Sequence, residues 1–335
     1  MSQLTITRRS ALGGALAMTV GSSIPASAQS KTLRLSHHLP PGHLVDIASK
    51  RFAELVAQSS NGALKVDVFP AAQIAGLKQG TESVQVGTLD LVWSDFGTLG
   101  NWKKEYGFMS LPFLFKDFDH VKKVFFGPLG AELKQDVSKQ MQIEILGFGT
   151  AGFRVMATRE RAINKPGDLA NLKFRVPEVP VFVSTFRQLK ANPTPMAFGE
   201  VYTALQTGVI DGVEVPAETM WSFKVQEVAK HVSKTYHILT DVHLMMSSSV
   251  LKGLPQAQQD IIVKAARQAV EEEYFKASLA AEDEFWAKLA GAMIPVQNPD
   301  RAAFQQALQP VWEEADKSSG GKMKVWTDKV LQASS

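Results

Sequence analysis

Hydrophobic positions in the first half of the chain follow two periods, one typical of strands and one typical of helices. Residues 32–36 alternate as in a strand, residues 44–59 place apolar side chains at helical spacing, and residues 64–69 alternate again. A strand, a helix and a second strand in this order imply a crossover connection, with parallel strands and helices on the faces of the sheet. The pattern continues to residue 148, so we expect an α/β fold.

A second run of the same kind begins at residue 153 and continues to residue 215. Two runs predict two α/β lobes, and such lobes bind ligands beyond the carboxyl ends of their strands, here in a cleft between them. Residues 255–290 are rich in Ala, Glu, Gln and Lys, with no proline after Pro255. This composition predicts an unusually long helix that would brace both lobes.

The first 28 residues have the features of an export signal. Arg8 and Arg9 precede an apolar stretch over residues 11–20, and residues 26–28 (Ala-Ser-Ala) form a small-residue cleavage site. The paired arginines resemble a twin-arginine signal, and an ordinary secretory signal that contains two arginines is the alternative. Both routes leave the cytoplasm, so we expect a periplasmic protein.

Composition narrows the possible functions of the 335-residue chain. Its formal charge of +3 falls to about +1 without Arg8 and Arg9, because the signal holds no other charged side chain. This charge is too small to indicate a basic surface that binds nucleic acid. The absence of cysteine excludes thiol catalysis, redox motifs and disulfides. No other stretch has the length and apolarity of a membrane span.

Two motifs suggest cofactors that their surroundings do not support. Residues 147–152 match G-x-G-x-x-G, but residues 153–156 alternate like a strand where a dinucleotide site needs a helix, so we interpret the glycines as a flexible crossing between lobes. His37 and His38 are adjacent and point to opposite faces of a strand, and no carboxylate stands at ligand spacing beside them or His43. We expect no metal and no cofactor, and we expect His38 to line the cleft.

Arg175 lies inside an apolar strand over residues 172–176, directly before Pro177. A cation leaving such a strand must meet water or a partner. It is either an exposed or internally paired arginine, or a planar guanidinium that offers two parallel hydrogen bonds to a ligand carboxylate. No metalloprotease, hydrolase-elbow or P-loop motif is present, but a catalytic pair made of Asp95 with Glu178 or Glu214 stays open.

Longer segments carry a family resemblance. Residues 161–177 and 192–212 closely resemble the solute-binding subunit of tripartite ATP-independent periplasmic (TRAP) transporters, and residues 69–74, 86–90 and 111–115 support the match. The resemblance therefore spans essentially the whole mature chain. It implies a two-lobed periplasmic-binding-protein fold with hinge strands and a long lobe-spanning helix.

From the resemblance we assign residues 29–152 and 241–280 to the first lobe, and residues 153–240 and 281–335 to the second. The family implies that a small organic acid is captured between the lobes and handed to TRAP membrane subunits. We expect a monomer that binds without chemistry. The alternative is an exported two-lobed α/β enzyme that acts on a small carboxylate.

The resemblance also implies roles for individual residues. Arg175 matches the arginine that pairs bidentately with the ligand carboxylate, and the other expected contacts are Arg154, Phe198, His38, Asp95, Glu178, Val215 and Trp221. In many members an asparagine that helps to hold the carboxylate stands at the position of Val215, which has no side-chain donor. Water, His38 or backbone replaces that contact, or the ligand is apolar there. Together with the aromatic residues Trp93, Phe198 and Trp221, this favours a monocarboxylate with an apolar or branched body, whereas Asp95 and Glu178 suit hydroxyl or amine groups.

Overall fold

The computed structural model describes residues 30–333, so the predicted export signal lies outside the described residues. The strands are β1 (Lys31–Ser36), β2 (Leu64–Phe69), β3 (Leu91–Ser94), β4 (Ile143–Thr158), β5 (Lys173–Val176), β6 (Asn192–Pro195), β7 (Gly212–Pro216), β8 (His231–Ser233), β9 (Leu239–Ser247) and β10 (Ile294–Val296).

The α-helices are α1 (Leu44–Ser59), α2 (Leu77–Gln85), α3 (Phe96–Leu99), α4 (Phe118–Phe126), α5 (Pro128–Met141), α6 (Pro180–Gln188), α7 (Val201–Thr207), α8 (Ala217–Ser222), α9 (Ser248–Lys252), α10 (Gln256–Ala266), α11 (Phe275–Ala292), α12 (Arg301–Ser318) and α13 (Lys322–Gln332). Short helical turns are η1 (Lys104–Ser110), η2 (Pro166–Leu169), η3 (Phe198–Glu200) and η4 (Val225–Glu227), and η5 (Arg267–Tyr274) is a π-helix. Within residues 30–333, no helix has the length and apolarity needed to cross a membrane.

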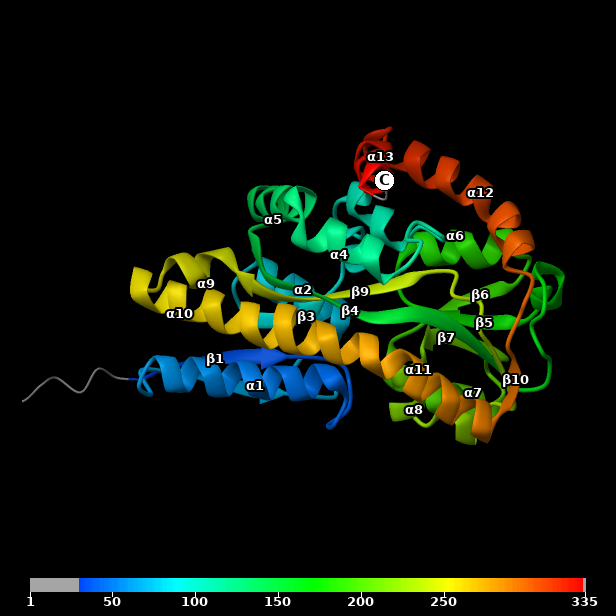
Figure 1. Cartoon of the computed structure of the whole chain (residues 1–335), viewed down its shortest axis with the longest axis horizontal. Coiled ribbons are helices and arrows are strands. Elements are labelled where there is room, and N and C mark those ends of the chain that lie inside the picture. Colours follow the sequence, from blue (N-terminus) through cyan, green and yellow to red (C-terminus); the bar gives the residue numbers. More distant parts are fainter. Residues whose placement is uncertain (1–29, 334–335) are drawn as a thin grey trace, which may run out of the picture.

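Two groups of parallel strands are joined by long antiparallel strands, and this arrangement makes the two lobes (Figure 1). The strand order is β2-β1-β3-β9-β4-β7-β5-β6, with β1 parallel to β2 and β3, and β5 parallel to β6 and β7. Parallel strands place their carboxyl ends at one edge of a sheet, so each lobe presents such an edge. The predicted two-lobed α/β fold is confirmed.

Strand β4 crosses from one lobe to the other. Its residues Ile143–Phe153 pair with β9, and its residues Arg154–Thr158 pair with β7. The glycines of the G-x-G-x-x-G motif lie inside this strand, where a Cβ at Gly149 would approach the ring of Tyr274 to 2.7 Å. They therefore let the long helix pack closely against the crossing strand, a reason for glycine that the motif did not reveal.

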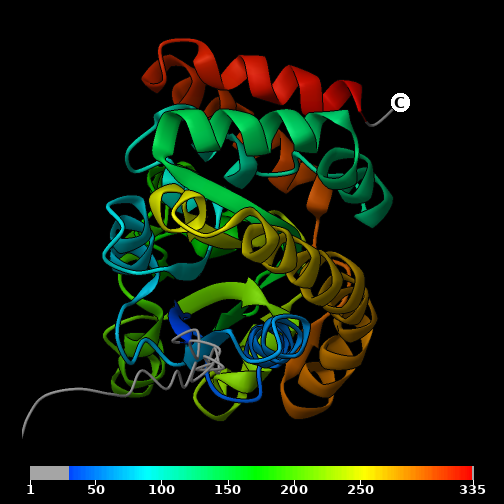
Figure 2. The same ribbon diagram turned by 90° about the vertical axis from the view of Figure 1, so that its left-hand side faces the viewer.

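The predicted long helix is present as α10, η5 and α11, which follow one another without a break. It contacts α1 in the first lobe and α8 in the second, and so spans both. In Figure 2 the blue α1 and the red α13 lie on opposite sides of the molecule, with the sheet strands between them.

Each lobe has its own apolar core, and a third core joins them. The first-lobe core holds Leu33, Phe52 and Trp93, and the second-lobe core holds Leu205 and Ile210. The third, around Phe96 and Phe174, also includes residues of α12 and α13. The lobe boundaries assigned from the sequence remain a prediction.

Candidate functional site

A cavity of about 390 Å³ lies between the lobes. Seven of the eight predicted contact residues line it: His38, Asp95, Arg154, Arg175, Glu178, Phe198 and Val215. Trp221 is not among the lining residues, because it packs half-buried against the second-lobe core. Trp93 lies in the first-lobe core and donates a 2.7 Å hydrogen bond to Ser49 Oγ.

Arg175 occupies the third position of β5, and alternation along that strand explains its direction. Phe174 and Val176 are fully buried in the core that joins the lobes, so Arg175 points to the opposite face, where the cavity lies. Pro177 follows and ends the strand. The sequence thus places a cation at the carboxyl end of a parallel strand, on the cleft side.

The guanidinium of Arg175 is buried but lacks a carboxylate partner. Its side chain is 4% exposed, and its Nε and Nη2 donate to the carbonyl oxygen of Met196 at 3.1 and 2.8 Å. Within residues 30–333 it forms no ion pair, and its Nη1 donates no hydrogen bond. Its guanidinium carbon lies 5.0 Å from the centre of the Phe198 ring. Burial, together with the nearby charge of Arg154, lowers the pKa of Arg175 to about 9, so it stays charged at neutral pH.

Arg154, in contrast, is paired within the protein. Its Nε and Nη2 bond the carboxylate of Glu214 in a bidentate arrangement, with Nη2 to Oε1 at 2.7 Å, and its Nη1 donates to Thr240 Oγ1 at 2.8 Å. His237 Nε2 lies 3.4 Å from Glu214 Oε2. Burial alone would raise the pKa of Glu214, but Arg154 and His237 hold it below its ordinary value. The charge of Arg154 is therefore already balanced.

The first-lobe wall of the cavity is acidic. Asp95 is the single residue between β3 and α3, and it caps α3 by accepting from Thr98 N at 2.6 Å. Asp241, on β9, accepts from Phe96 N at 2.8 Å and lies 3.0 Å from Nε2 of His243. Burial and the charge of Asp241 raise the pKa of Asp95 to about 7. The wall therefore places two carboxyl groups beside the cavity.

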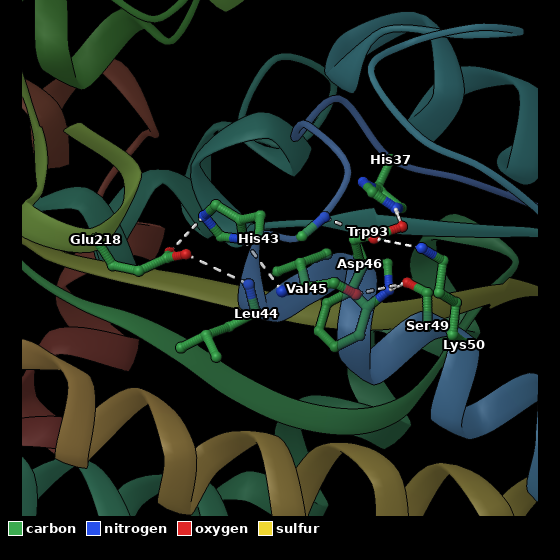
Figure 3. A network of polar contacts seen from close by, with 10 residues as sticks. His37, His43, Leu44, Val45, Asp46, Ser49, Lys50, Trp93 and Glu218 are labelled. Carbon is green, nitrogen blue, oxygen red and sulfur yellow. Dashed lines mark hydrogen bonds and ion pairs between the residues drawn. The ribbon is translucent and has the colours of Figure 1, made fainter. Parts of the chain in front are cut away.

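The histidines around β1 take different places. His38 lines the cavity, and burial together with His37 lowers its pKa to about 3, so it is neutral. His37 is buried 3.5 Å from the carboxylate of Asp46, and burial lowers its pKa to about 4. His43 caps α1 (Figure 3). Within residues 30–333, no three His, Cys, Asp or Glu side chains form a group that could hold a metal ion.

Several lining residues carried no signal in the sequence. They are Thr98 and Asp241 on the first-lobe side, and Phe182, Thr219 and Phe223 on the second-lobe side. Asp241 is a polar residue inside the mostly apolar sequence of β9, and that position is a signal from which it could have been found. The others lie in short helices or, for Phe223, directly after one, and their direction depends on how the helices pack.

A cavity between two α/β lobes, with hinge strands and a buried cation on one wall, defines a two-lobed solute-binding protein. The family model described as "Bacterial extracellular solute-binding protein, family 7" matches residues 35–318. The chain belongs to this family, whose structures include the periplasmic solute-binding proteins of TRAP transporters.

Relatives and solved structures agree with this assignment. The chain is 35% identical over 300 residues to a solute-binding protein of Verminephrobacter eiseniae, covering 88% of each chain. It is 30% identical over 305 residues to the sialic acid-binding periplasmic protein SiaP of Vibrio cholerae, covering 91% of this chain and 94% of that one. A TRAP periplasmic solute-binding protein from Polaromonas, solved with D-erythronate, superposes with a TM-score of 0.83 at 30% identity, covering 89% of this chain and 98% of that one. Another from Roseobacter denitrificans, solved with L-galactonate, gives the same TM-score and identity, with coverages of 90% and 99%.

Proposed function

We propose that this protein captures a hydroxylated monocarboxylate in the periplasm and delivers it unchanged to the membrane subunits of a TRAP transporter. The observation that carries the proposal is the environment of Arg175. A buried cation normally has a carboxylate partner, because an unpaired charge in a protein interior is costly. Arg175 finds none within residues 30–333 and faces the cavity, so a ligand carboxylate supplies the missing partner.

The rest of the cavity favours a single carboxylate on the ligand. Arg154 is paired with Glu214, so it does not offer a second unpaired positive charge to the ligand. A second ligand carboxylate would meet Asp95 and Asp241 on the first-lobe wall, where like charges repel. Hydroxyl groups instead donate hydrogen bonds to these carboxylates.

Phe198 and Val215 provide apolar surface for the carbon chain of the ligand. D-erythronate and L-galactonate, bound by the Polaromonas and Roseobacter proteins, have this combination of one carboxylate and several hydroxyls. In this cavity, such a carboxylate would pair with Arg175, and the hydroxyl groups would donate to the carboxyl groups of Asp95 and Asp241.

We propose binding without turnover because neither of the two carboxylates considered as a catalytic partner of Asp95 is suited to that role. Glu214 is held ionised by Arg154, which leaves it unable to donate a proton near neutral pH. Glu178 lies exposed at the rim of the cavity and not inside it. The arrangement supports charge pairing and lobe closure, in which the ligand stabilises the closed form by binding it more tightly than the open form.

A thermal-shift panel with matched acids and neutral compounds tests the proposal. The mature chain is heated with D-erythronate, L-galactonate, succinate or erythritol, the last being a neutral analogue of D-erythronate. We expect the two sugar acids to raise the melting temperature, because a ligand of the native state stabilises it, and erythritol to have no effect. Equal shifts by erythritol and D-erythronate, or recovery of a chemically altered acid, would contradict the proposal.

A further inference from the structure

A buried polar contact joins the two lobes at the point where α1 of the first lobe meets α8 of the second (Figure 3). Nε2 of His43 lies 2.6 Å from Oε2 of Glu218 and 3.2 Å from Oγ1 of Thr219. Oε1 of Glu218 accepts from the backbone N–H of Leu44 at 3.3 Å. Both the His43 and the Glu218 side chains are buried, with exposed fractions of 0% and 9%.

The contact connects two bodies with separate cores. Val45 and Phe52 of α1 belong to the first-lobe core, and Ala217 and Met220 of α8 belong to the second-lobe core. Because the two side chains are carried by different lobes, a movement that parts the lobes at this point would separate them. The contact is therefore a property of the closed arrangement rather than of either lobe alone.

The first turn of α1 fixes which nitrogen of His43 reaches Glu218. The backbone N–H of Val45 donates to Nδ1 of His43 at 3.1 Å, so Nδ1 carries no proton. In the neutral ring the proton then sits on Nε2 and points at Glu218 and Thr219. His43 thus caps its own helix with one nitrogen and binds the opposite lobe with the other.

The loop before α1 holds His43 in place. The carboxylate of Asp46 accepts from the backbone N–H of Gly42 at 2.8 Å and from Nζ of Lys50 at 2.7 Å. Asp46 is itself fully buried in the first turn of the helix, where a negative charge is favourable. The imidazole is therefore preorganised, so little ordering is needed when Glu218 arrives.

The contact also lies at the edge of the cavity, because Thr219, which follows Glu218, lines it. On opening, Glu218 returns to water, and the first amides of α1 lose one acceptor. On closing, Glu218 meets both a histidine N–H and the positive end of a helix. The carboxylate of Glu218 thus has favourable partners in the closed arrangement that the open one lacks.

We propose that Glu218 and His43 form a latch that stabilises the closed arrangement of the lobes independently of the contacts between protein and acid. The inference assumes the opening and closing that solute capture requires, but not the identity of the acid. The latch sets how readily the lobes close, and Arg175 sets which ligands keep them closed.

Distance measurements between spin labels test the latch directly. The chain contains no cysteine, so labels attached to Val86→Cys and Val209→Cys report one distance across the cleft. Both positions are exposed, at 67% and 56%. We expect Glu218→Ala to lower the ratio of closed to open molecules about tenfold at a given D-erythronate concentration, because hydrogen bonds to a charged group contribute on that scale. Glu218→Gln, which keeps the shape, should give a smaller decrease.

Hydrogen exchange at the start of α1 gives a readout that needs no acid. In Glu218→Ala we expect faster exchange of the Leu44 amide than in the parent protein. The matched control is Glu160→Gln, which disrupts an exposed ion pair with Lys230 inside the second lobe and should change neither readout.

Unchanged distances in Glu218→Ala would overturn the latch even if exchange at Leu44 is faster, because removing the acceptor alone speeds that exchange. If no acid shortens the distance in the parent, the proposed function fails, and the distances in the acid-free protein still decide the latch, because Glu218→Ala should lower the closed fraction there too.

Discussion

The two buried arginines of the cleft have similar surroundings, but only one of them has a carboxylate that balances its charge. Each lies over a phenylalanine ring, with Arg154 4.8 Å from the centre of Phe182 and Arg175 5.0 Å from that of Phe198. Arg154 has an internal carboxylate on Glu214, whereas Arg175 has only a backbone carbonyl. Under the proposed function, the unpaired cation is the one that meets the carboxylate of the ligand. Both side chains are buried, so the presence or absence of a carboxylate partner, and not burial, distinguishes them.

The largest expected effect comes from removing the partner of the paired arginine. Glu214→Ala leaves Arg154 charged and unpaired in the interior, which should cost about 3–5 kcal/mol of unfolding free energy. Denaturant unfolding measures this loss. Glu160→Ala, which disrupts an exposed ion pair with Lys230, is the control and should cost at most about 1 kcal/mol. Equal losses in the two variants would mean that Arg154 does not depend on Glu214.

The acidic wall opposite Arg175 should make stability depend on pH. The pKa of Asp95 is about 7 in the folded protein and 3.8 ordinarily, so the folded form binds the proton more tightly. As pH rises from about 4 to about 7, this group therefore destabilises the fold, and the effect is constant above that range.

Asp95→Asn keeps the cap on α3 but removes the titration. As pH rises through this range, the melting temperature of the variant should gain a few degrees relative to that of the parent. Thermal scans at several pH values measure the difference. A difference between variant and parent that stays constant with pH would show that Asp95 does not titrate there.

The smallest expected effect is the loss of acid affinity when the aromatic ring next to either arginine is replaced. Phe198→Leu removes the aromatic face beneath Arg175 and should weaken acid binding about threefold to tenfold, since such contacts contribute about 1 kcal/mol. Phe182→Leu, beneath the paired Arg154, should change affinity less. Calorimetric titration of both variants compares them, and a larger loss in Phe182→Leu would reverse the assignment of roles.

The fold could be predicted because it rests on local patterns, whereas the role of Arg175 as the anchor came from the family resemblance and stays a prediction. Alternating periods indicated two α/β lobes, and a lone cation in an apolar strand marked Arg175. The partner of Arg154 depends on the antiparallel pairing of β4 with β7, which brings Glu214 beside it. No periodicity within either segment specifies that pairing.

Two further differences follow from tertiary packing. Asp241 reaches the cavity only because β9 pairs with β3, next to Asp95. Thr219 and Phe223, four residues apart, share the cavity-facing side of the chain at α8, and Trp221 between them points away. The direction of a short helix was not readable from its composition. The glycines of β4 likewise serve close packing against Tyr274, a contact across more than a hundred residues.

The central claim is that Arg175 holds the carboxylate of the ligand through two-point geometry. Calorimetric titration of the best acid from the thermal-shift panel into the parent, Arg175→Lys and Arg154→Lys proteins tests it most directly. We expect Arg175→Lys to bind on the order of 100-fold more weakly while its acid-free melting temperature stays close to that of the parent, because lysine keeps the charge but not the planar fork. For Arg154→Lys, the loss of unfolding free energy should be at least as large as the loss of binding free energy. Equal affinity in Arg175→Lys and the parent would contradict the account.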